Sequence, residues 1–126
     1  MIEHSIDSSL HLLEVRVSDS VKLLDLVNFI ATAQKDLQYG PSLNTLFVVD
    51  PDTDLAKLSP ASFSTFFGRV EESGGAALWA IVASNESHNS TLASAVHNFI
   101  PHRLNVRVFD DEFLALQWLK VNDTKR

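Results

Sequence analysis

Three aspartates in the segment Asp50-Pro51-Asp52-Thr53-Asp54 form the most suggestive chemical cluster in the sequence. Carboxylate oxygens are the ligands that hard cations such as Mg²⁺ and Ca²⁺ prefer in proteins. As a calcium-binding loop counted from Asp50 the segment fails, because Leu55 stands where a glycine must turn the chain and Ala61 where a bidentate glutamate is needed. The cluster leaves two interpretations, which are a site for a Mg²⁺-assisted reaction and a solvated turn built by aspartate and proline.

Asp50 and Asp52 resemble the Asp-x-Asp start of haloacid-dehalogenase-like phosphatases. The resemblance implies a small Mg²⁺-dependent phosphohydrolase that uses these two carboxylates. The chain is short for that family and shows no later lysine-and-acid partners. We therefore keep the phosphohydrolase as the alternative hypothesis, which stoichiometric Mg²⁺ binding in calorimetry would support.

Phe63, Phe66 and Phe67 follow the pair Ser59-Pro60 at helical spacing, so they form one side of an amphipathic helix. Such an apolar stripe is the usual core face of a helix that covers a sheet. Three adjacent rings are more than one stripe requires. We predict that Phe66 or Phe67 borders a ligand cleft or a self-association patch, which burial of both rings inside the monomer would rule out.

The histidines carry weaker signals. His88 lies in a run of serines that could supply a nucleophile, namely Ser84, Ser87 and Ser90, but a Gly-x-Ser-x-Gly elbow is missing. A turn followed by a helix N-cap is the alternative for this run. His97 and His102 are separated by Pro101, which spoils the helical spacing of a metal pair. The absence of cysteine excludes disulfides, thiolate zinc sites, iron–sulfur clusters and cysteine nucleophiles, and the four glycines form neither a phosphate loop nor a dinucleotide fingerprint. Our leading hypothesis therefore has no cofactor, no metal site and no catalytic residue.

The composition describes an acidic globular protein. The 126 residues carry 10 basic and 16 acidic side chains, for a net charge of -6, and this field repels phosphate backbones, so we expect no nucleic-acid partner. The longest apolar run, residues 76–83, is far shorter than the about 20 residues that cross a bilayer as a helix, so we expect no membrane span. The first residues lack the basic and then apolar layout of a secretory signal, which predicts a cytoplasmic protein.

Strand-like and helix-like segments alternate along the chain. Leu13, Val15 and Val17 alternate with polar residues, which predicts a strand near a sheet edge, with residues 2–6 as its antiparallel partner. The continuous apolar runs 45–49 and 77–83 predict central strands of a parallel sheet that are buried on both faces. Helices are expected from a cap at Ser18 or Asp19 to residue 40 and from 59 to 74, and a third helix that ends at residue 100 is marked by Leu92, Val96, Phe99 and Ile100.

Two periodicities meet in the segment 106–119. Val106 and Val108 alternate with polar residues, and the apolar residues then follow at helical steps: Leu114, Ala115, Trp118 and Leu119. Carboxylates at 110–112 can cap this helix, while the small Ala115 lets it approach the sheet and Trp118 fills the remaining gap. The whole pattern predicts one α/β domain over residues 1–126, with a mostly parallel sheet, an antiparallel edge strand, about four helices and a short flexible tail.

The strand Leu46-Phe47-Val48-Val49 ending in Asp50, the strand Val106-Arg107-Val108-Phe109, and the positions Ala115 and Trp118-Leu119 together resemble a known group. This is the SpoIIAA-like group of small bacterial proteins, which share the fold of STAS domains and of Sec14-type lipid-binding proteins. The likeness covers residues 10–120. It implies a non-enzymatic, self-associating domain, expected to be a homodimer, that binds a protein partner or a small apolar ligand.

The resemblance also implies a modification site. In STAS domains of the anti-sigma-factor-antagonist type, a partner kinase phosphorylates a serine where the helix after the first central strand begins. This sequence reads Leu58-Ser59-Pro60-Ala61 there, without the acidic residue and glycine of the usual Asp-Ser-Ser-Gly segment. Ser59 or Ser62 is the candidate modification site, and the expected binding residues are Asp50, Ser59, Ser62, Phe63, Phe66 and Phe67.

Overall fold

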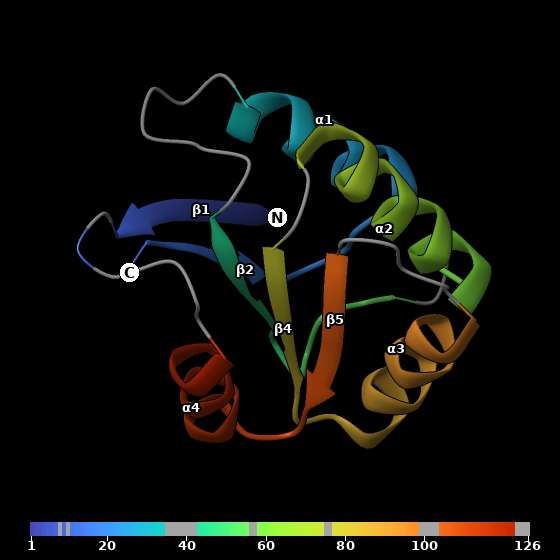
Figure 1. The fold of residues 1–126 in the computed structure, drawn as a ribbon. Coiled ribbons are helices and arrows are strands. Elements are labelled where there is room, and N and C mark those ends of the chain that lie inside the picture. The colour runs from blue at the N-terminus through green and yellow to red at the C-terminus, as the bar shows by residue number, and fades with distance from the viewer. Residues whose placement is uncertain are drawn as a thin grey trace.

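A five-stranded sheet in the order β1-β2-β3-β4-β5 forms the centre of the computed structural model (Figure 1). The structure describes residues 1–7, 9, 11–34, 43–55, 58–74, 77–98 and 104–122. The strands are β1 (Ile2–Asp7), β2 (Leu12–Val17), β3 (Asn44–Val49), β4 (Ala77–Ala83) and β5 (Leu104–Phe109). The helices in the described ranges are α1 (Leu23–Gln34), α2 (Pro60–Gly74), α3 (Glu86–Asn98) and α4 (Glu112–Asn122).

The sheet is mostly parallel. β1 pairs antiparallel with β2, and each later strand lies parallel to the one before it, which confirms the predicted α/β class with an antiparallel edge strand. Because every strand lies beside its predecessor and crossovers keep one hand, the connecting helices α1, α2 and α3 share one face of the sheet. α4 follows the last strand and covers the other face (Figure 1).

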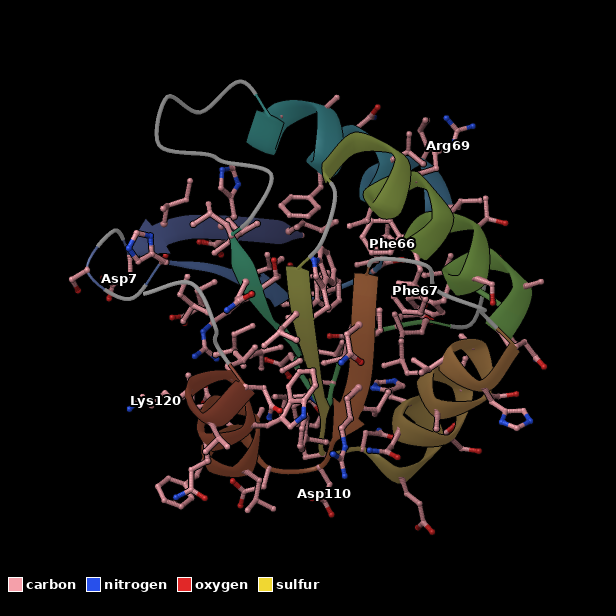
Figure 2. All side chains as sticks on the ribbon, in the orientation of Figure 1. Asp7, Phe66, Phe67, Arg69, Asp110 and Lys120 are labelled. Atoms are coloured by element: carbon pink, nitrogen blue, oxygen red, sulfur yellow. The ribbon has the colours of Figure 1, made fainter. Side chains whose placement is uncertain are left out.

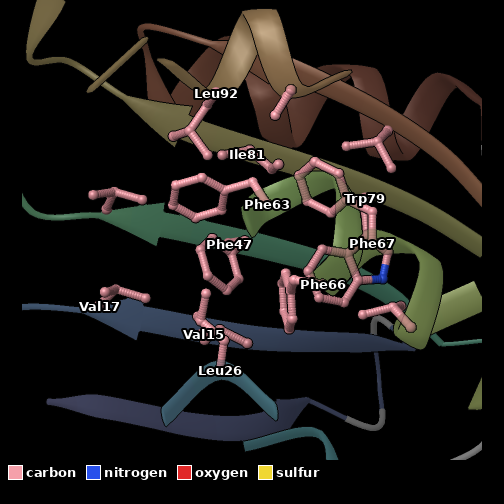
Figure 3. Close-up of a cluster of buried hydrophobic side chains, with 14 of the residues drawn as sticks. Val15, Val17, Leu26, Phe47, Phe63, Phe66, Phe67, Trp79, Ile81 and Leu92 are labelled. Carbon is pink, nitrogen blue, oxygen red and sulfur yellow. The ribbon is translucent and has the colours of Figure 1, made fainter. Parts of the chain in front are cut away.

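The larger core lies between the sheet and α1–α3 and is built around aromatic rings (Figure 3). Phe47 stacks on Trp79 with ring centroids 5.6 Å apart, and Phe66 meets Trp79 edge to face at 5.7 Å. Such contacts between aromatic rings stabilise a core beyond the area they bury. The rings of Phe63 and Phe67 lie in the same cluster, so α2 contributes three phenylalanines to the interior.

The smaller core lies under α4. Ala115 is fully buried there, in a cluster with strand residues of the sheet that includes Leu46, Ala80 and Val82. Trp118 is half-buried and packs on Phe109 with ring centroids 5.6 Å apart. Asp111 Oδ1 accepts hydrogen bonds from the backbone N–H groups of residues 113 and 114, at 2.7 and 3.3 Å. The predicted cap, close helix approach and tryptophan filler are all confirmed.

The start of α1 differs from the prediction. The helix begins at Leu23, whereas a cap at Ser18 or Asp19 was expected. Asp19 adopts a left-handed backbone conformation, with φ 61°, and Ser20 forms an isolated parallel bridge with Asp54. These long-range pairings keep residues 18–22 out of the helix, and Asp25 Oδ2 instead accepts the backbone N–H of Lys22 at 2.9 Å.

The sequence also predicted the absence of a membrane span, the ends of two helices and a flexible tail. No helix in the described ranges is long and apolar enough to cross a membrane. The predicted ends of the first and third helices, at residues 40 and 100, lie outside the described residues. The predicted flexible tail after residue 122 lies outside them as well.

Candidate functional site at the carboxyl edge of the sheet

The connection that follows β3 begins with a tight turn made by the aspartate cluster. Asp50 Oδ1 accepts the backbone N–H of Asp52 at 3.0 Å, and the Asp50 carbonyl accepts the N–H of Thr53 at 3.0 Å. This is an Asx turn, in which an aspartate side chain mimics a backbone turn. One of the two interpretations of the cluster is thus present in the structure, with the carboxylates of Asp50 and Asp52 exposed.

Hydrogen bonds from the neighbouring segments hold this turn in place. Thr53 is buried, and its hydroxyl donates to the carbonyl of Val17 at 3.0 Å, while the Asp50 N–H donates to the same carbonyl at 2.9 Å. The Asp54 N–H donates to the carbonyl of Asp19 at 2.6 Å. From the other side, Asn85 Nδ2 donates to the carbonyl of Pro51 at 3.0 Å. The ends of β2, β3 and β4 are therefore tied together through buried or paired backbone groups.

Four carboxylates gather where β2 and β3 end. Asp19, Asp50, Asp52 and Asp54 are all exposed, and we call them the β2–β3 rim. Backbone hydrogen bonds join the Asp54 segment to the residues after β2, so the four lie on two short segments that are paired with each other. Like charges held together in this way create a local negative potential that attracts cations and basic partners.

The Mg²⁺ hypothesis requires a ligand set at Asp50 and Asp52. Within the described ranges, no group of three or more histidine, cysteine, aspartate or glutamate side chains is placed to hold a metal ion. Asp50 in addition uses one carboxylate oxygen for the turn. The phosphohydrolase with Asp50 and Asp52 stays a prediction, for which a calorimetric titration with Mg²⁺ is the test.

The two candidate modification serines form the N-terminal cap of α2. Ser59 Oγ accepts the backbone N–H of Ser62 at 3.2 Å, and Ser62 Oγ accepts the backbone N–H of Ser59 at 3.3 Å. This reciprocal arrangement is a capping box, and Pro60 occupies the first helical position as predicted. Ser59 is exposed and Ser62 is half-buried. Phosphorylation of Ser59 or Ser62 stays a prediction, which intact-mass measurement of the protein from the native cell tests.

We expect Ser59→Ala to lower the free energy of unfolding by about 1 kcal/mol, because loss of an N-cap hydroxyl typically costs about 0.5–2 kcal/mol. Urea denaturation of both proteins measures the difference. Ser90→Ala on the exposed side of α3 is the matched control, and it should change stability by less than about 0.5 kcal/mol. Equal effects of the two substitutions would contradict the capping role.

The predicted aromatic cleft is wrong. Phe63, Phe66 and Phe67 are 2%, 0% and 1% exposed, so all three rings are packed inside the monomer (Figures 2 and 3). Neither Phe66 nor Phe67 borders a ligand cleft or a self-association patch. The physical reason is that α2 covers the centre of the sheet. Phe47 and Trp79 of the sheet pack against Phe66 there, so the core accommodates all the phenylalanines of α2.

His88 lies in the first turn of α3, where no serine hydroxyl in the described ranges forms a hydrogen bond with it. Asn85 Oδ1 accepts the backbone N–H groups of Ser87 and His88 at 2.9 and 3.2 Å, which confirms the predicted turn and N-cap in this run. The Nδ1 atom of His88 is buried and has no hydrogen-bond partner among the described residues. His102, which the sequence did not predict to form a metal site with His97, lies outside the described residues.

Sequence reasoning missed a second polar feature at the same edge of the sheet. A cleft of about 510 Å³ opens between the carboxyl ends of β4 and β5, with Glu86, Asn89, Arg107 and Asp110 among its lining residues. Asp110 had been assigned only to helix capping. The alternation around Arg107 marked an exposed strand position, but only the strand order places this residue beside the start of α3.

Fold and site together define an α/β domain whose mostly parallel five-stranded sheet gathers its polar turns at the carboxyl edge. The chain matches no protein-family model, no curated protein and no solved structure.

Proposed function

We propose that this chain is a non-enzymatic binding domain of the SpoIIAA-like and STAS-like kind, which recognises a basic surface on a protein partner through the β2–β3 rim. The observation that carries the proposal is the set of four exposed carboxylates on two short segments, one after β2 and one after β3. Hydrogen bonds join these segments to each other, to the end of β2 and to Asn85 after β4. The order of strands and helices, with Ala115 and Trp118 of the last helix packed against the sheet, supports the kinship.

Charge and order both favour a protein partner with lysine and arginine side chains. Opposite charges across an interface steer the encounter and suppress wrong partners. A surface whose turns are already fixed loses less conformational entropy on binding than a mobile loop does. The turn at Asp50 and the hydrogen bond from the Thr53 hydroxyl to the Val17 carbonyl provide that order, because both involve backbone groups.

A small apolar ligand receives less support. The cleft expected for such a ligand was lined by the phenylalanines of α2. Those rings are buried, and Phe66 packs against Phe67 and Trp79. The homodimer stays a prediction, which sedimentation of the purified chain tests. A two-fold contact through the β2–β3 rim would place like charges opposite each other, so self-association would need another surface.

Site-specific photo-crosslinking in the native cell tests the proposal. A benzophenone side chain at Ser20, which is exposed beside the rim and leaves all four carboxylates in place, should give a discrete adduct with a protein whose crosslinked segment is basic. The control is the same probe at Val121, which is 81% exposed at the far end of α4 and should not give this adduct.

Two results would contradict the rim as the recognition surface. One is an adduct of equal yield from Val121, and the other is an adduct from Ser20 that persists unchanged when Asp19 and Asp52 are replaced by asparagine. Mass spectrometry of the adduct identifies the partner and the crosslinked segment, which makes direct binding measurements feasible.

A further inference from the structure

The cleft between β4 and β5 arises from the way the chain leaves these two strands. β4 leads into α3 on one face of the sheet, while β5 leads into α4 on the other face (Figure 1). Where neighbouring parallel strands send their connections to opposite faces, a crevice opens beyond their carboxyl ends, and open α/β sheets bind their ligands at such crevices. The volume of about 510 Å³ lies within the range of small-molecule sites.

The floor of the cleft is held by one amide side chain. Asn89 Nδ2 donates to the carbonyl of Ala83 at the end of β4, at 3.0 Å, and to the carbonyl of Phe109 at the end of β5, at 3.4 Å. Asn85 caps the first turn of α3 beside it. The two strand ends and the helix start are therefore fixed relative to one another, so the lining residues are arranged before any ligand arrives.

Opposite charges line this cleft without contacting each other. Arg107 is exposed, and its guanidinium carbon lies 5.6 Å from the centre of the Phe109 ring. Glu86 and Asp110 are exposed in the same lining, and Asp110 is labelled at the carboxyl edge in Figure 2. Among the described residues, Arg107 forms no ion pair with either carboxylate, since the ion pairs found there all involve Arg16. A single ligand that carries a negative and a positive group can pair with Arg107 and with the carboxylates at the same time.

We infer that this cleft binds a small zwitterion of the α-amino acid class. Arg107 offers the planar, two-pronged donor that pairs with a carboxylate, and Asp110 and Glu86 offer acceptors for an ammonium group. Phe109, which is half-buried, lies under the Arg107 guanidinium and adds an apolar element to the cleft lining. This site uses none of the four rim carboxylates, so it stands independently of the proposed protein partner.

Amide chemical-shift mapping of the full chain tests the inference, with the protein amino acids added one at a time in the millimolar range. At least one should shift the amides of residues 84–89 and 107–110 in a saturable way. Analogues of that amino acid lacking only the amine or only the carboxylate should bind about tenfold more weakly or worse, because each loses one charge-assisted contact. Arg107→Gln and Asp110→Asn should each weaken binding by a similar factor, whereas Arg69→Gln, an exposed position on α2 (Figure 2), should leave it unchanged.

Three outcomes would overturn the inference. They are the absence of cleft shifts with every amino acid, equal binding of the carboxylate-only analogue, which would describe a simple anion site, and full affinity in both cleft variants. Shifts confined to residues 19 and 50–54 would also count against it. Because the readout is resolved by residue, failure at the cleft is distinguishable from failure of the rim as a protein-binding surface.

Discussion

Phe66→Ala should lower the free energy of unfolding by about 3–5 kcal/mol, the range typical of a buried phenylalanine truncated in a well-packed core. Phe66 has no exposed surface and contacts the rings of Phe47, Phe67 and Trp79, with centroids 5.7–6.0 Å away. Its removal loses the transfer free energy of the ring and leaves a cavity, since sheet and helix cannot collapse onto each other. Urea denaturation monitored by tryptophan fluorescence and by circular dichroism measures the loss.

Phe113→Ala provides the matched control. It is the same chemical change at a ring that is 65% exposed on α4, and it should alter stability by less than about 0.5 kcal/mol. A small effect at Phe66, equal to that at Phe113, would mean that the ring lies at a surface, which would restore the aromatic cleft.

The elements with strong periodicity could be predicted from the sequence. The alternation at Leu13, Val15 and Val17 and the apolar run of β4 depend on which faces are buried, and local residue types record that directly. The same holds for Asp111 and Ala115, because a cap and a close helix contact each require a particular kind of side chain at one position.

The predictions that were wrong or missing concern features that depend on residues far apart in the sequence. α1 begins later than its local capping residues indicate, because Ser20 and Asp19 pair with Asp54 across the ends of β2 and β3. The phenylalanines of α2 looked too numerous for a core because the sequence does not show that Phe47 and Trp79 face them from adjacent strands. The cleft at Arg107 could not be foreseen, since it depends on strand order and on the face that each helix covers.

Replacement of two rim carboxylates should weaken binding of the crosslinked partner by about tenfold or more, which corresponds to about 1.4 kcal/mol. Asp19→Asn/Asp52→Asn removes two charges with little change of shape. Asparagine tolerates the left-handed conformation at position 19 as aspartate does. The side chain of Asp52 is exposed, so its replacement should leave the fold intact. The expected loss is electrostatic and should shrink as salt screens it.

A second double variant separates location from net charge. Glu3→Gln/Asp7→Asn removes the same number of charges from β1, where both side chains are exposed. Asp7 pairs with Leu12 at the amino end of β2 and Glu3 pairs with Arg16, so neither residue belongs to the rim. The Asp7 oxygen that accepts the N–H of Ser9 is retained by asparagine. This variant should bind the partner as the unmodified chain does.

The dissociation constant of that partner, measured by calorimetry at low and at high salt for the unmodified chain and both double variants, tests the role of the β2–β3 rim most directly. We predict a loss of about tenfold or more at low salt for Asp19→Asn/Asp52→Asn alone, with a smaller difference at high salt. Equal constants for all three proteins at low salt would contradict the assignment of recognition to the carboxyl edge.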